Sequence, residues 1–560
     1  MREETDVCVI GSGAGGAPVA AAVADAGYQV IVLEKGPYLE RDQMPKDEIL
    51  FVRRNTLTPS LADEPQVQEW GDAGGRRWWA RTSAFRNACV VGGATRIMSG
   101  FFLRMKEDDF RLQSAFGPVP GSSVSDWPWG LSELEPWYDR VERVVGVSGR
   151  VTELPPALAD RRSSPAFPQP PTLEHPLAER VDNVLGGRGL HPFPLPRAVL
   201  SEPREGRDAC EYQGFCGSYG CTSGAKGSAY EAFLRPAEST RRCSVRARAH
   251  VTHVETDRRG LVRRAWWRDA RNALHSVEAR VFVVACGAIE SARLLLQSRG
   301  PRHPDGLANG SGQVGRNLLF STAGAAIGDM AHEDHPDVDL GSWEPFINRA
   351  LQDHYVLPGP DGRAHRGGTL VFLFVHPHPI GNALGHALSG GGRPLWGRAL
   401  KERILAHTKQ GRRLEVEAFG EWLPHAGARV ALDPEVRDRH GLPVARVTAD
   451  VHPHSKQNAV RLAELGANHL RSLGARGVRL PSTNGGPSTN LVGGTCRIGD
   501  DPRTSVLDRH CRAHEVSNLF VTDGSFMPSG GAVPFTFTIY ANAMRVGQRI
   551  VEQLGGPRPG

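Results

Sequence analysis

The stretch Val7-Cys8-Val9-Ile10-Gly11-Ser12-Gly13-Ala14-Gly15-Gly16 decides the fold. An apolar strand runs into a glycine turn, an Ala-rich helix follows, and a second strand from Gln29 to Leu33 ends at Glu34. The glycines permit a tight turn, let a pyrophosphate approach the backbone, and let the helix pack closely on the strand. The helix N-terminus offers unpaired N–H groups to phosphates, and Glu34 can accept hydrogen bonds from ribose hydroxyls. The stretch therefore predicts a Rossmann-type dinucleotide-binding domain.

The bulk composition is typical of a globular enzyme. The chain has 560 residues, of which 40% are hydrophobic and 23% charged, so a length of this order suggests roughly two to four domains. The net charge of +6 is small and the basic residues are spread along the chain, so we expect no nucleic-acid partner and no membrane partner. The first strand leaves no room for a signal peptide and no apolar run reaches transmembrane length, which predicts a cytoplasmic location. The nine cysteines are unevenly spaced and do not resemble a disulfide framework.

Periodicity predicts further elements and a discontinuous domain organisation. We expect helices at residues 131–145, 288–297 and 454–473, and strands at residues 281–287, 369–375, 413–418 and 444–451. We assign residues 1–150, 200–319 and 486–560 to the dinucleotide-binding domain, residues 151–199 to a Pro-rich linker and cap segment, and residues 320–485 to a substrate-binding domain built on an antiparallel sheet.

Five ordered motifs are similar to those of the glucose–methanol–choline (GMC) oxidoreductases. They are GSGAGG with Glu34, VVGGATRIMSGFFLR from Val90, DWPWGLSELEPWYDRVE from Asp126, GAIESARLLLQS from Gly287, and GTCRIGDDPRTSVLDRHCRAHEVSNLFVTDGSFMPSGG from Gly494. The resemblance spans nearly the whole chain, with the order and spacing of the motifs intact. It implies an α/β fold with an inserted antiparallel sheet, bound FAD, and oxidation of a CH–OH group by hydride transfer to flavin N5.

The resemblance also implies where FAD is bound. The glycine turn after Val91 passes beside the isoalloxazine ring, the strand around Val251 lies along the adenine, and Met98 stands where many members carry an Asn near the ring. Asp523 and Gly524 lie by the pyrophosphate and ribityl chain. The residues expected at the cofactor are Gly11, Gly13, Ala14, Gly15, Gly16, Glu34, Lys35, Gly92, Gly93, Ala94, Thr95, Met98, Val251, Ala285, Gly287, Asp523, Gly524 and Thr536.

The chain departs from the family pattern at both catalytic positions. Members usually carry a His shortly before the GTC run, and here Asn490 or Leu491 occupies that place. A second His or Asn normally precedes the Pro after the SGG turn, and here Val533 or Pro534 falls there. Alcohol oxidation needs a base near the substrate oxygen, and neither Val nor Pro accepts a proton.

Three explanations of this departure stay open. A His from the loop at residues 376–386 is one candidate base. Alternatively, Asn490 orients the alcohol while water or a nearby carboxylate accepts the proton. The third possibility is that alcohol oxidation has been lost and the flavin serves non-oxidative or light-driven chemistry, or a silent flavin-binding subunit.

A cysteine cluster has two interpretations. Cys210, Cys216 and Cys221 follow a C-x5-C-x4-C spacing in a segment similar to one in bacterial gluconate- and glucose-dehydrogenase-like members of the family. The resemblance raises a three-iron cluster, since thiolates are the usual ligands of iron–sulfur centres. Ordinary buried thiols explain the spacing equally well, and we predict no metal site.

The substrate class rests on two carboxylates. Glu415 and Glu417 alternate with apolar residues, so both lie on one face of their strand. We expect that face to contact water; in the alternative, it faces the flavin and suits a cationic amino sugar. The predicted function is FAD-dependent oxidation of a small-molecule sugar, polyol or secondary-metabolite alcohol, with the electron acceptor, oxygen or a carrier, left open.

Overall fold

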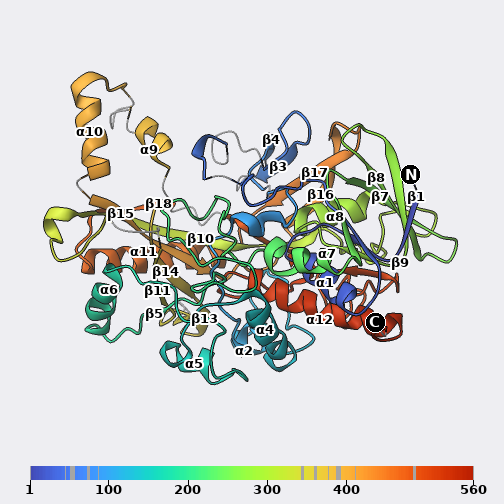
Figure 1. Cartoon of the computed structure of the whole chain (residues 1–560), viewed down its shortest axis with the longest axis horizontal. Coiled ribbons are helices and arrows are strands. Elements are labelled where there is room, and N and C mark those ends of the chain that lie inside the picture. Colours follow the sequence, from blue (N-terminus) through green and yellow to red (C-terminus); the bar gives the residue numbers. More distant parts are fainter. Residues whose placement is uncertain are drawn as a thin grey trace.

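Two β-sheets lie along the long axis of the molecule in the computed structural model, with the chain termini at the same end (Figure 1). The structure describes residues 2–44, 46–50, 57–71, 76–85, 88–341, 346–358, 362–375, 378–385, 387, 393–409, 411–482 and 487–558. Within these ranges no helix is both long and apolar enough to cross a bilayer.

The smaller sheet is the predicted dinucleotide-binding core. In the described part of the chain its seven strands run in the order β6-β2-β1-β9-β8-β7, with β20 beside β9, and β6, β2, β1, β9 and β20 are parallel. The register places Val7 of β1 between Val30 of β2 and Val281 of β9. Buried apolar strands of this kind form parallel sheets covered by helices on their faces. The strands are β1 (Arg2–Ile10), β2 (Val30–Leu33), β6 (Cys243–Arg246), β7 (His250–Thr256), β8 (Val262–Arg268), β9 (Leu274–Val284) and β20 (Leu519–Val521).

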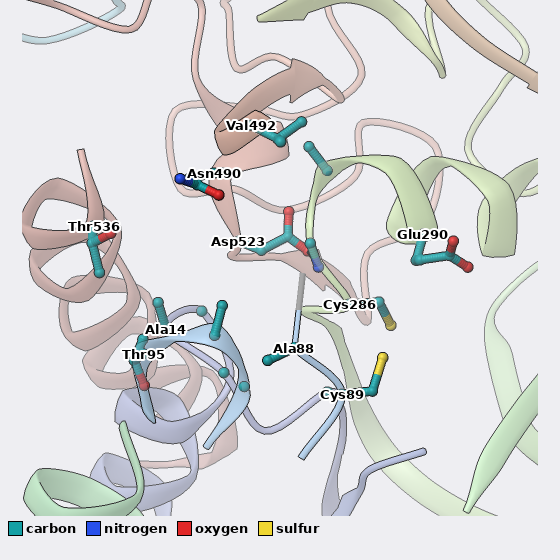
Figure 2. Close-up of a pocket in the computed structure, with 18 of the residues that line it drawn as sticks. Ala14, Ala88, Cys89, Thr95, Cys286, Glu290, Asn490, Val492, Asp523 and Thr536 are labelled. Atoms are coloured by element: carbon teal, nitrogen blue, oxygen red, sulfur yellow. The ribbon is translucent and has the colours of Figure 1, made fainter. Parts of the chain in front are cut away.

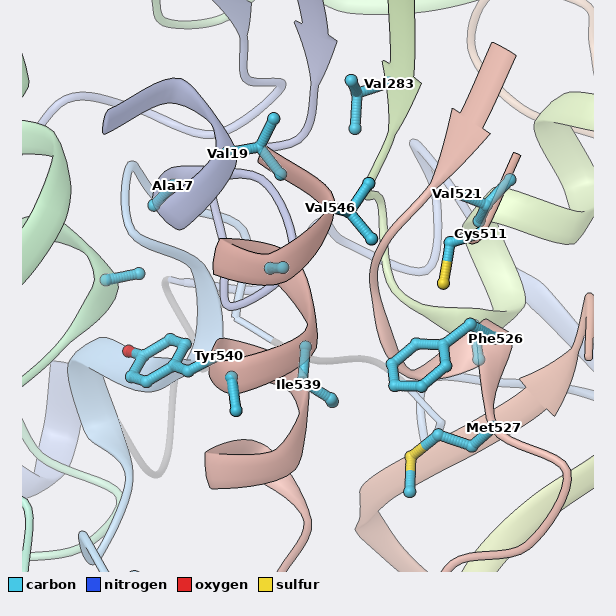
Figure 3. Packing of buried hydrophobic residues seen from close by; sticks show 14 of the residues in the cluster. Ala17, Val19, Val283, Cys511, Val521, Phe526, Met527, Ile539, Tyr540 and Val546 are labelled. Carbon is cyan, nitrogen blue, oxygen red and sulfur yellow. The ribbon is translucent and has the colours of Figure 1, made fainter. Parts of the chain in front are cut away.

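Helices α1 (Ala17–Asp25) and α12 (Thr536–Leu554) pack against this sheet and against each other (Figure 3). Val19 of α1, Val546 of α12 and Val283 of β9 are each fully buried in one continuous core. The helices approach closely because Gly547 faces α1: a Cβ added there would meet Ala22 Cβ at 2.8 Å. The chain end is thus fixed beside the opening βαβ unit.

Among the described residues, the larger sheet has eleven strands and is mainly antiparallel. Its order is β4-β3-β17-β16-β10-β15-β14-β11-β5, with β18 and β19 also paired to β10, and β17 pairs β3 in parallel. The strands are β3 (Gln66–Gly71), β4 (Arg77–Thr82), β5 (Phe193–Pro194), β10 (Arg316–Ala331), β11 (Phe346–Leu351), β14 (Gly368–Phe374), β15 (Gly411–Gly420), β16 (Ala428–Arg437), β17 (Pro443–Ala449), β18 (Arg476–Ser482) and β19 (Pro487–Thr495). A separate hairpin joins β12 (Val356–Pro358) and β13 (Ala364–Arg366).

Helix α11 (Pro453–Ser472) covers one face of this larger sheet. Leu414, Val416 and Leu470 are buried in a common apolar cluster, and Gly466 lets the helix approach: a Cβ there would lie 3.0 Å from Val416 Cγ1. Because strand side chains alternate, the other face of β15 presents Glu415 and Glu417 toward the dinucleotide-binding domain.

The membership of the larger sheet departs from the domain boundaries expected from sequence. β3 and β4 come from residues 1–150, β5 from residues 151–199, and β19 from residues 486–560, yet all four join the sheet otherwise formed by residues 320–485. Strand pairing between segments far apart in sequence leaves no local pattern, so the boundaries could not reflect it.

Three helices match positions expected from the sequence. α4 (Leu131–Val145) and α8 (Ala288–Gln297) agree with the prediction, and α11 lies within one residue of it. The predicted strand at residues 281–287 ends earlier, at Val284, because Gly287 has a φ of +84° and begins α8 as its N-cap. The others are α2 (Glu107–Phe110), α3 (Leu112–Phe116), α5 (Pro156–Ala159), α6 (Leu177–Gly186), α7 (Arg235–Ser239), α9 (Pro379–Gly385) and α10 (Gly397–Lys409).

Candidate active site

A cavity of about 670 Å³ lies where the two sheets meet. Its walls come from the opening glycine turn, the end of β2, the short 3₁₀ turn Gly93–Ile97, β7, α8, β15, β19 and the start of α12 (Figure 2). Among the described residues, four of the five shared motifs contribute to its lining, and the motif that begins at Asp126 does not.

The glycines of the opening turn are required for different reasons. A Cβ on Gly11, whose φ is +102°, would meet the Ala285 carbonyl oxygen at 2.2 Å, and one on Gly15 would meet Asp523 N at 2.5 Å. At Gly13 the nearest atom is Gly93 Cα at 3.8 Å. Gly11 and Gly15 thus let the chain pack, whereas Gly13 leaves its backbone open to the cavity, as a pyrophosphate needs.

Glu34 stabilises the turn through its carboxylate. Ser12 donates both its backbone N–H (3.2 Å) and its hydroxyl (2.6 Å) to Oε2, and the N–H of Gly36 donates to Oε1 at 2.8 Å. Ser12 Oγ in turn accepts the N–H of Gly92 at 3.0 Å, which joins the two glycine turns. Glu34 lines the cavity with these bonds made, and its contact with a ribose stays a prediction.

Asp523 positions the start of α8. Its Oδ2 accepts the N–H of Gly287 at 3.0 Å and the hydroxyl of Ser291 at 2.5 Å, while Oδ1 accepts the N–H of Ser525 at 2.9 Å. Gly287 has open space where a Cβ would stand, so its backbone also faces the cavity freely. Burial raises the pKa of Asp523 above its usual range.

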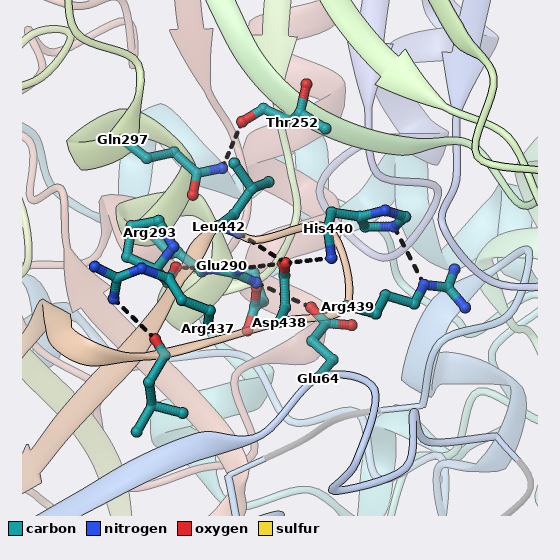
Figure 4. A network of polar contacts seen from close by, with 12 residues as sticks. Glu64, Thr252, Glu290, Arg293, Gln297, Arg437, Asp438, Arg439, His440 and Leu442 are labelled. Carbon is teal, nitrogen blue, oxygen red and sulfur yellow. Dashed lines mark hydrogen bonds and ion pairs between the residues drawn. The ribbon is translucent and has the colours of Figure 1, made fainter.

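The predicted adenine end contains an ion network rather than free cations. Lys35 Nζ lies 2.9 Å from Glu64. Arg293 contacts Glu64 at 3.0 Å and Asp438 at 2.6 Å (Figure 4). The Lys35 side chain lines the cavity, but its charge is already balanced by carboxylates. Beside it, burial lowers the pKa of His250 to about 4, so this ring is neutral at physiological pH.

The predicted flavin end contains the second glycine turn. Thr95 donates its hydroxyl to the Gly92 carbonyl at 2.6 Å and accepts the N–H of Ala229 at 2.8 Å, which fixes the turn. Of the expected cofactor residues, the structure places Gly16 and Gly92 behind the wall, where Gly16 packs against the Gly11 backbone. The others line the cavity: Gly11, Gly13, Ala14, Gly15, Glu34, Lys35, Gly93, Ala94, Thr95, Met98, Val251, Ala285, Gly287, Asp523, Gly524 and Thr536.

Asn490 reaches the cavity through a bulge in β19. Phe320 of β10 pairs with Val492 and the next residue, Ser321, pairs with Ser488, so residues 489–491 have no partner on β10. The extra residues bend the strand and direct Asn490 into the cavity (Figure 2). At the second departure, Pro534 lines the cavity and Val533 is buried behind it.

No histidine lies at the flavin end among the described cavity residues; His250 is at the opposite end. From the loop proposed to supply a base, His378 is described and its Nδ1 lies 3.0 Å from the Tyr219 hydroxyl, away from the cavity wall. His376 and His386 are outside the described residues.

Two carboxylates stand in the cavity wall instead. Glu415 and Glu417 of β15 line the cavity together with Leu373 and Phe419, so the expectation that they face water is wrong. Burial raises the pKa of Glu415 to about 7. Burial, reinforced by the charge of Glu415, raises the pKa of Glu417 to about 8. The alternation in the sequence correctly predicts that both residues lie on one face of β15. Whether that face borders the cavity or the solvent depends on the pairing of β15 with β10 and β14.

The three clustered cysteines are thiols that do not converge in the described structure. Cys210 and Cys221 pack at the edge of a small apolar cluster with Leu200, while Cys216 packs against the main core. Cys210 Sγ accepts the N–H of Tyr212 at 3.4 Å. No group of three metal-ligating side chains occurs among the described residues.

The cavity fits FAD on its own geometry. Gly13 and Gly287 leave backbone open to the cavity as phosphates would need, residues of both glycine turns line it, and strands β15 and β19 of the larger sheet form another part of its wall. Such a site can hold a dinucleotide whose reactive ring faces a substrate space under β15.

Comparison with known families agrees with this geometry. Two family models described as GMC oxidoreductase match residues 200–356 and 424–543, and a model of an FAD binding domain matches residues 6–41.

Curated relatives align along almost the whole chain. A 6'''-hydroxyparomomycin C oxidase from Streptomyces lividus is 31% identical over 565 residues, covering 99% of this chain and 92% of that protein. Paromamine 6'-oxidase from Streptomyces fradiae is 31% identical, covering 98% and 92%. A 2-methyl-1,2-propanediol dehydrogenase from Mycolicibacterium austroafricanum is 31% identical, covering 98% and 95%.

Solved structures share the fold. A pyridoxine 4-oxidase from Mesorbium loti has a TM-score of 0.58 at 19% identity, covering 97% of this chain and 98% of that chain. A formate oxidase has a TM-score of 0.61 at 14% identity, covering 98% of each chain.

Proposed function

Because this chain belongs to the GMC oxidoreductase family, an FAD-dependent class that oxidises CH–OH groups, we propose that its substrate is an alcohol carrying ammonium groups, of the amino-sugar class. The observation that carries the proposal is the pair Glu415 and Glu417 in the wall of the cavity. Two carboxylates in a half-buried wall favour a cationic ligand, since a paired charge is far less costly to bury than a lone one.

The surroundings of the pair support a cationic ligand. Neither carboxylate forms an ion pair among the described residues, and their neighbours across the sheet are Ala325 and Ile327 on β10 and Val371 and Leu373 on β14. The nearest cation on the same face of β15, Arg413, contacts Asp329 at 3.2 Å. Both carboxyl groups are therefore available to pair with a cation in the cavity, and such a cation would favour their ionised forms.

Relatives of this chain support the same class. The names of two of the curated relatives specify oxidation of paromamine and of hydroxyparomomycin C, which are polyamino sugars. An acidic wall is the feature that a site for such polycations needs.

Different residues of the chain have different roles in the proposed reaction. The glycine turns and Asp523 hold and orient the cofactor, and bound FAD supplies the acceptor for the hydride. The acidic wall anchors the ammonium groups, and Asn490 at the bulge of β19 orients the hydroxyl that reacts. Pro534 and Phe535 exclude water from the same region.

An anaerobic titration tests the proposal. The purified FAD protein is mixed with paromamine, with its fully N-acetylated derivative, and with glucose, while flavin absorbance is followed. We expect paromamine to bleach the flavin, and the acetylated derivative and glucose to do so at least tenfold less efficiently. Bleaching by glucose or simple polyols alone, with none by amino sugars, would contradict the assignment.

We propose further that the enzyme acts in the cytoplasm, in secondary metabolism. The relatives include proteins named as oxidases and others named as dehydrogenases, so an experiment must identify the electron acceptor. Oxygen consumption during turnover identifies an oxidase, and turnover that requires an added dye identifies a dehydrogenase.

A further inference from the structure

We propose that Glu417 is the group that accepts the substrate's hydroxyl proton, and that Glu415 anchors a substrate ammonium beside it. This inference rests on the proposed function, because it assigns the two carboxylates separate roles in the same reaction. It supplies the base that is missing at both family positions.

The direction of β15 sets Glu417 closer to the flavin end. Thr369 of β14 pairs with Phe419, and its hydroxyl bonds the Ala532 carbonyl at 2.7 Å, just before the cavity residues Pro534 to Thr536. Glu417 is the next cavity-facing residue along the strand and Glu415 follows it. Alternate strand residues stand about 6–7 Å apart, so Glu415 lies one such step further from the reacting end.

The bulge on β19 and Glu417 lie on opposite sides of Thr322 along β10. Thr322 of β10 pairs with Gly420 on one side and with Pro487 on the other, so β19 and β15 flank β10 at one level. Asn490 lies on the side of Phe320, whereas Glu417 lies opposite Ala325, and both line the cavity. A substrate that extends from the Asn490 side along β15 therefore meets Glu417 before Glu415, which lies opposite Ile327.

The charged surroundings of Glu417 are simple. From β15 itself it faces Glu415; from β10 and β14 it faces Ala325 and Val371 across the register. Arg413, further along the strand, is paired with Asp329. In this setting an arriving ammonium at Glu415 offsets the negative charge beside Glu417 and favours its ionised form.

The step balances in atoms and electrons. The O–H bond of the alcohol breaks and its proton passes to the Glu417 carboxylate. The C–H bond breaks, its hydrogen leaves with the electron pair to the cofactor, and the carbonyl bond forms from the former O–H pair. The substrate loses two electrons, which the cofactor gains, and Glu417 returns its proton to water after product leaves.

Stopped-flow reduction of the FAD enzyme by paromamine over pH 5.5–9.5 tests the assignment. In the wild type we expect the apparent second-order rate constant of flavin reduction to rise about tenfold per pH unit and to level near pH 8. We call this rising part of the pH profile the limb. Glu417→Gln is expected to lower the rate of flavin reduction about 100-fold or more and to remove the limb, since a positioned base contributes about 10²–10⁴-fold. Glu417→Asp should keep the limb at a reduced rate. The exposed Glu464→Gln, on the far side of the sheet, serves as the control.

Glu415→Gln separates anchoring from proton transfer. It should raise the Kd of paromamine about tenfold, leave the limiting rate within about threefold, and move the limb to lower pH, because the like charge beside Glu417 is gone. A second readout does not need turnover: calorimetry with 1,3-diaminopropane, in two buffers of different ionisation enthalpy, counts protons released on binding at pH 7. We expect release in the wild type and less release in Glu415→Gln.

The outcomes separate the two claims. If paromamine reduces wild-type flavin but Glu417→Gln and Glu417→Asp keep the wild-type rate and limb, Glu417 is not the proton acceptor and the proposed function stands. If the wild type is not reduced by any amino sugar, the proposed function fails first. If Glu417→Gln does not retain FAD, loss or retention of the limb in Glu417→Asp decides.

Discussion

The hydroxyl of Thr369 on β14 donates a 2.7 Å hydrogen bond to the carbonyl oxygen of Ala532, in the loop that leads into α12. The contact fastens the substrate-side sheet to the cofactor-side loop that carries Pro534 and Phe535. The same hydroxyl accepts a hydrogen bond from Gln352 Nε2 at 3.0 Å, and Thr369 is fully buried. This buried hydroxyl therefore connects the larger sheet to the loop before α12.

Thr369→Val tests the contribution of this hydroxyl to stability. The change keeps the shape of the side chain but leaves two buried polar groups unpaired, so we expect the free energy of unfolding to fall by about 1–3 kcal/mol. Urea unfolding followed by flavin fluorescence measures it. Thr504→Val, at an exposed threonine, is the control, and an equal effect of both variants would contradict a role for the buried hydroxyl.

Gly13→Ala and Gly15→Ala are expected to fail in different ways. A methyl group at Gly13 finds open space in the protein alone but occupies the backbone approach of the pyrophosphate, so the apoprotein should fold normally and bind FAD about 100-fold or more weakly. At Gly15 the methyl would meet Asp523 N at 2.5 Å, so the fold itself should be destabilised. Thermal unfolding with and without added FAD separates the two. Equal melting temperatures of both apoproteins would count against this reading.

The glycine turns could be predicted because their chemistry is local. One βαβ unit contains Gly11 to Gly16 and Glu34, and one turn contains Gly93 to Thr95. The structural role of each of these residues therefore follows from a short stretch of sequence. The cavity-facing side of β15 could not be predicted in this way. Alternation put Glu415 and Glu417 on one face, but only pairing with strands forty to ninety residues away determines what that face meets.

The position of Asn490 falls between these cases. The departure before the GTC run, with Asn490 or Leu491 in the place of a His, is visible in the sequence, whereas the bulge against β10 depends on the register of a distant strand. Glu421 directly follows β15 and is buried, but the local sequence does not indicate this burial, because carboxylates are mostly exposed.

Glu421→Gln is expected to stabilise the protein at alkaline pH. The side chain is 2% exposed, and burial, together with the charge of Asp109, raises its pKa to about 8. The unfolded chain ionises near its ordinary value while the folded state stays protonated, so this group's contribution to stability is full at acid pH and is lost as pH rises toward 8. The amide removes that loss and can still accept the N–H of Gly530, which Glu421 Oε1 accepts at 3.4 Å.

The measurement is urea unfolding of both proteins at pH 5 and pH 9. We expect the variant to gain about 1–3 kcal/mol more at pH 9 than at pH 5. The exposed Glu435→Gln is the matched control and should show no such difference. A variant that loses stability equally at both pH values would mean that the carboxylate is ionised and needed.

Asn490→Ala separates orientation from proton transfer. If Asn490 orients the hydroxyl, its removal should lower the limiting rate of flavin reduction about 10-fold to 100-fold, because misplacement of a reacting group is costly even when the chemistry is intact. The pH at which the rate levels should not move, since the amide does not titrate. Loss of the pH limb in this variant would instead tie Asn490 to the proton itself.

The most direct test of the account is the anaerobic reduction of bound flavin by paromamine, compared in wild type and in Glu415→Gln/Glu417→Gln. The account predicts that paromamine bleaches the wild-type flavin, that its N-acetylated derivative does so at least tenfold less efficiently, and that the double variant loses both the reaction and this preference while still being reduced by dithionite. Equal bleaching by the charged and acetylated sugars, unchanged in the double variant, would contradict the role of the acidic wall.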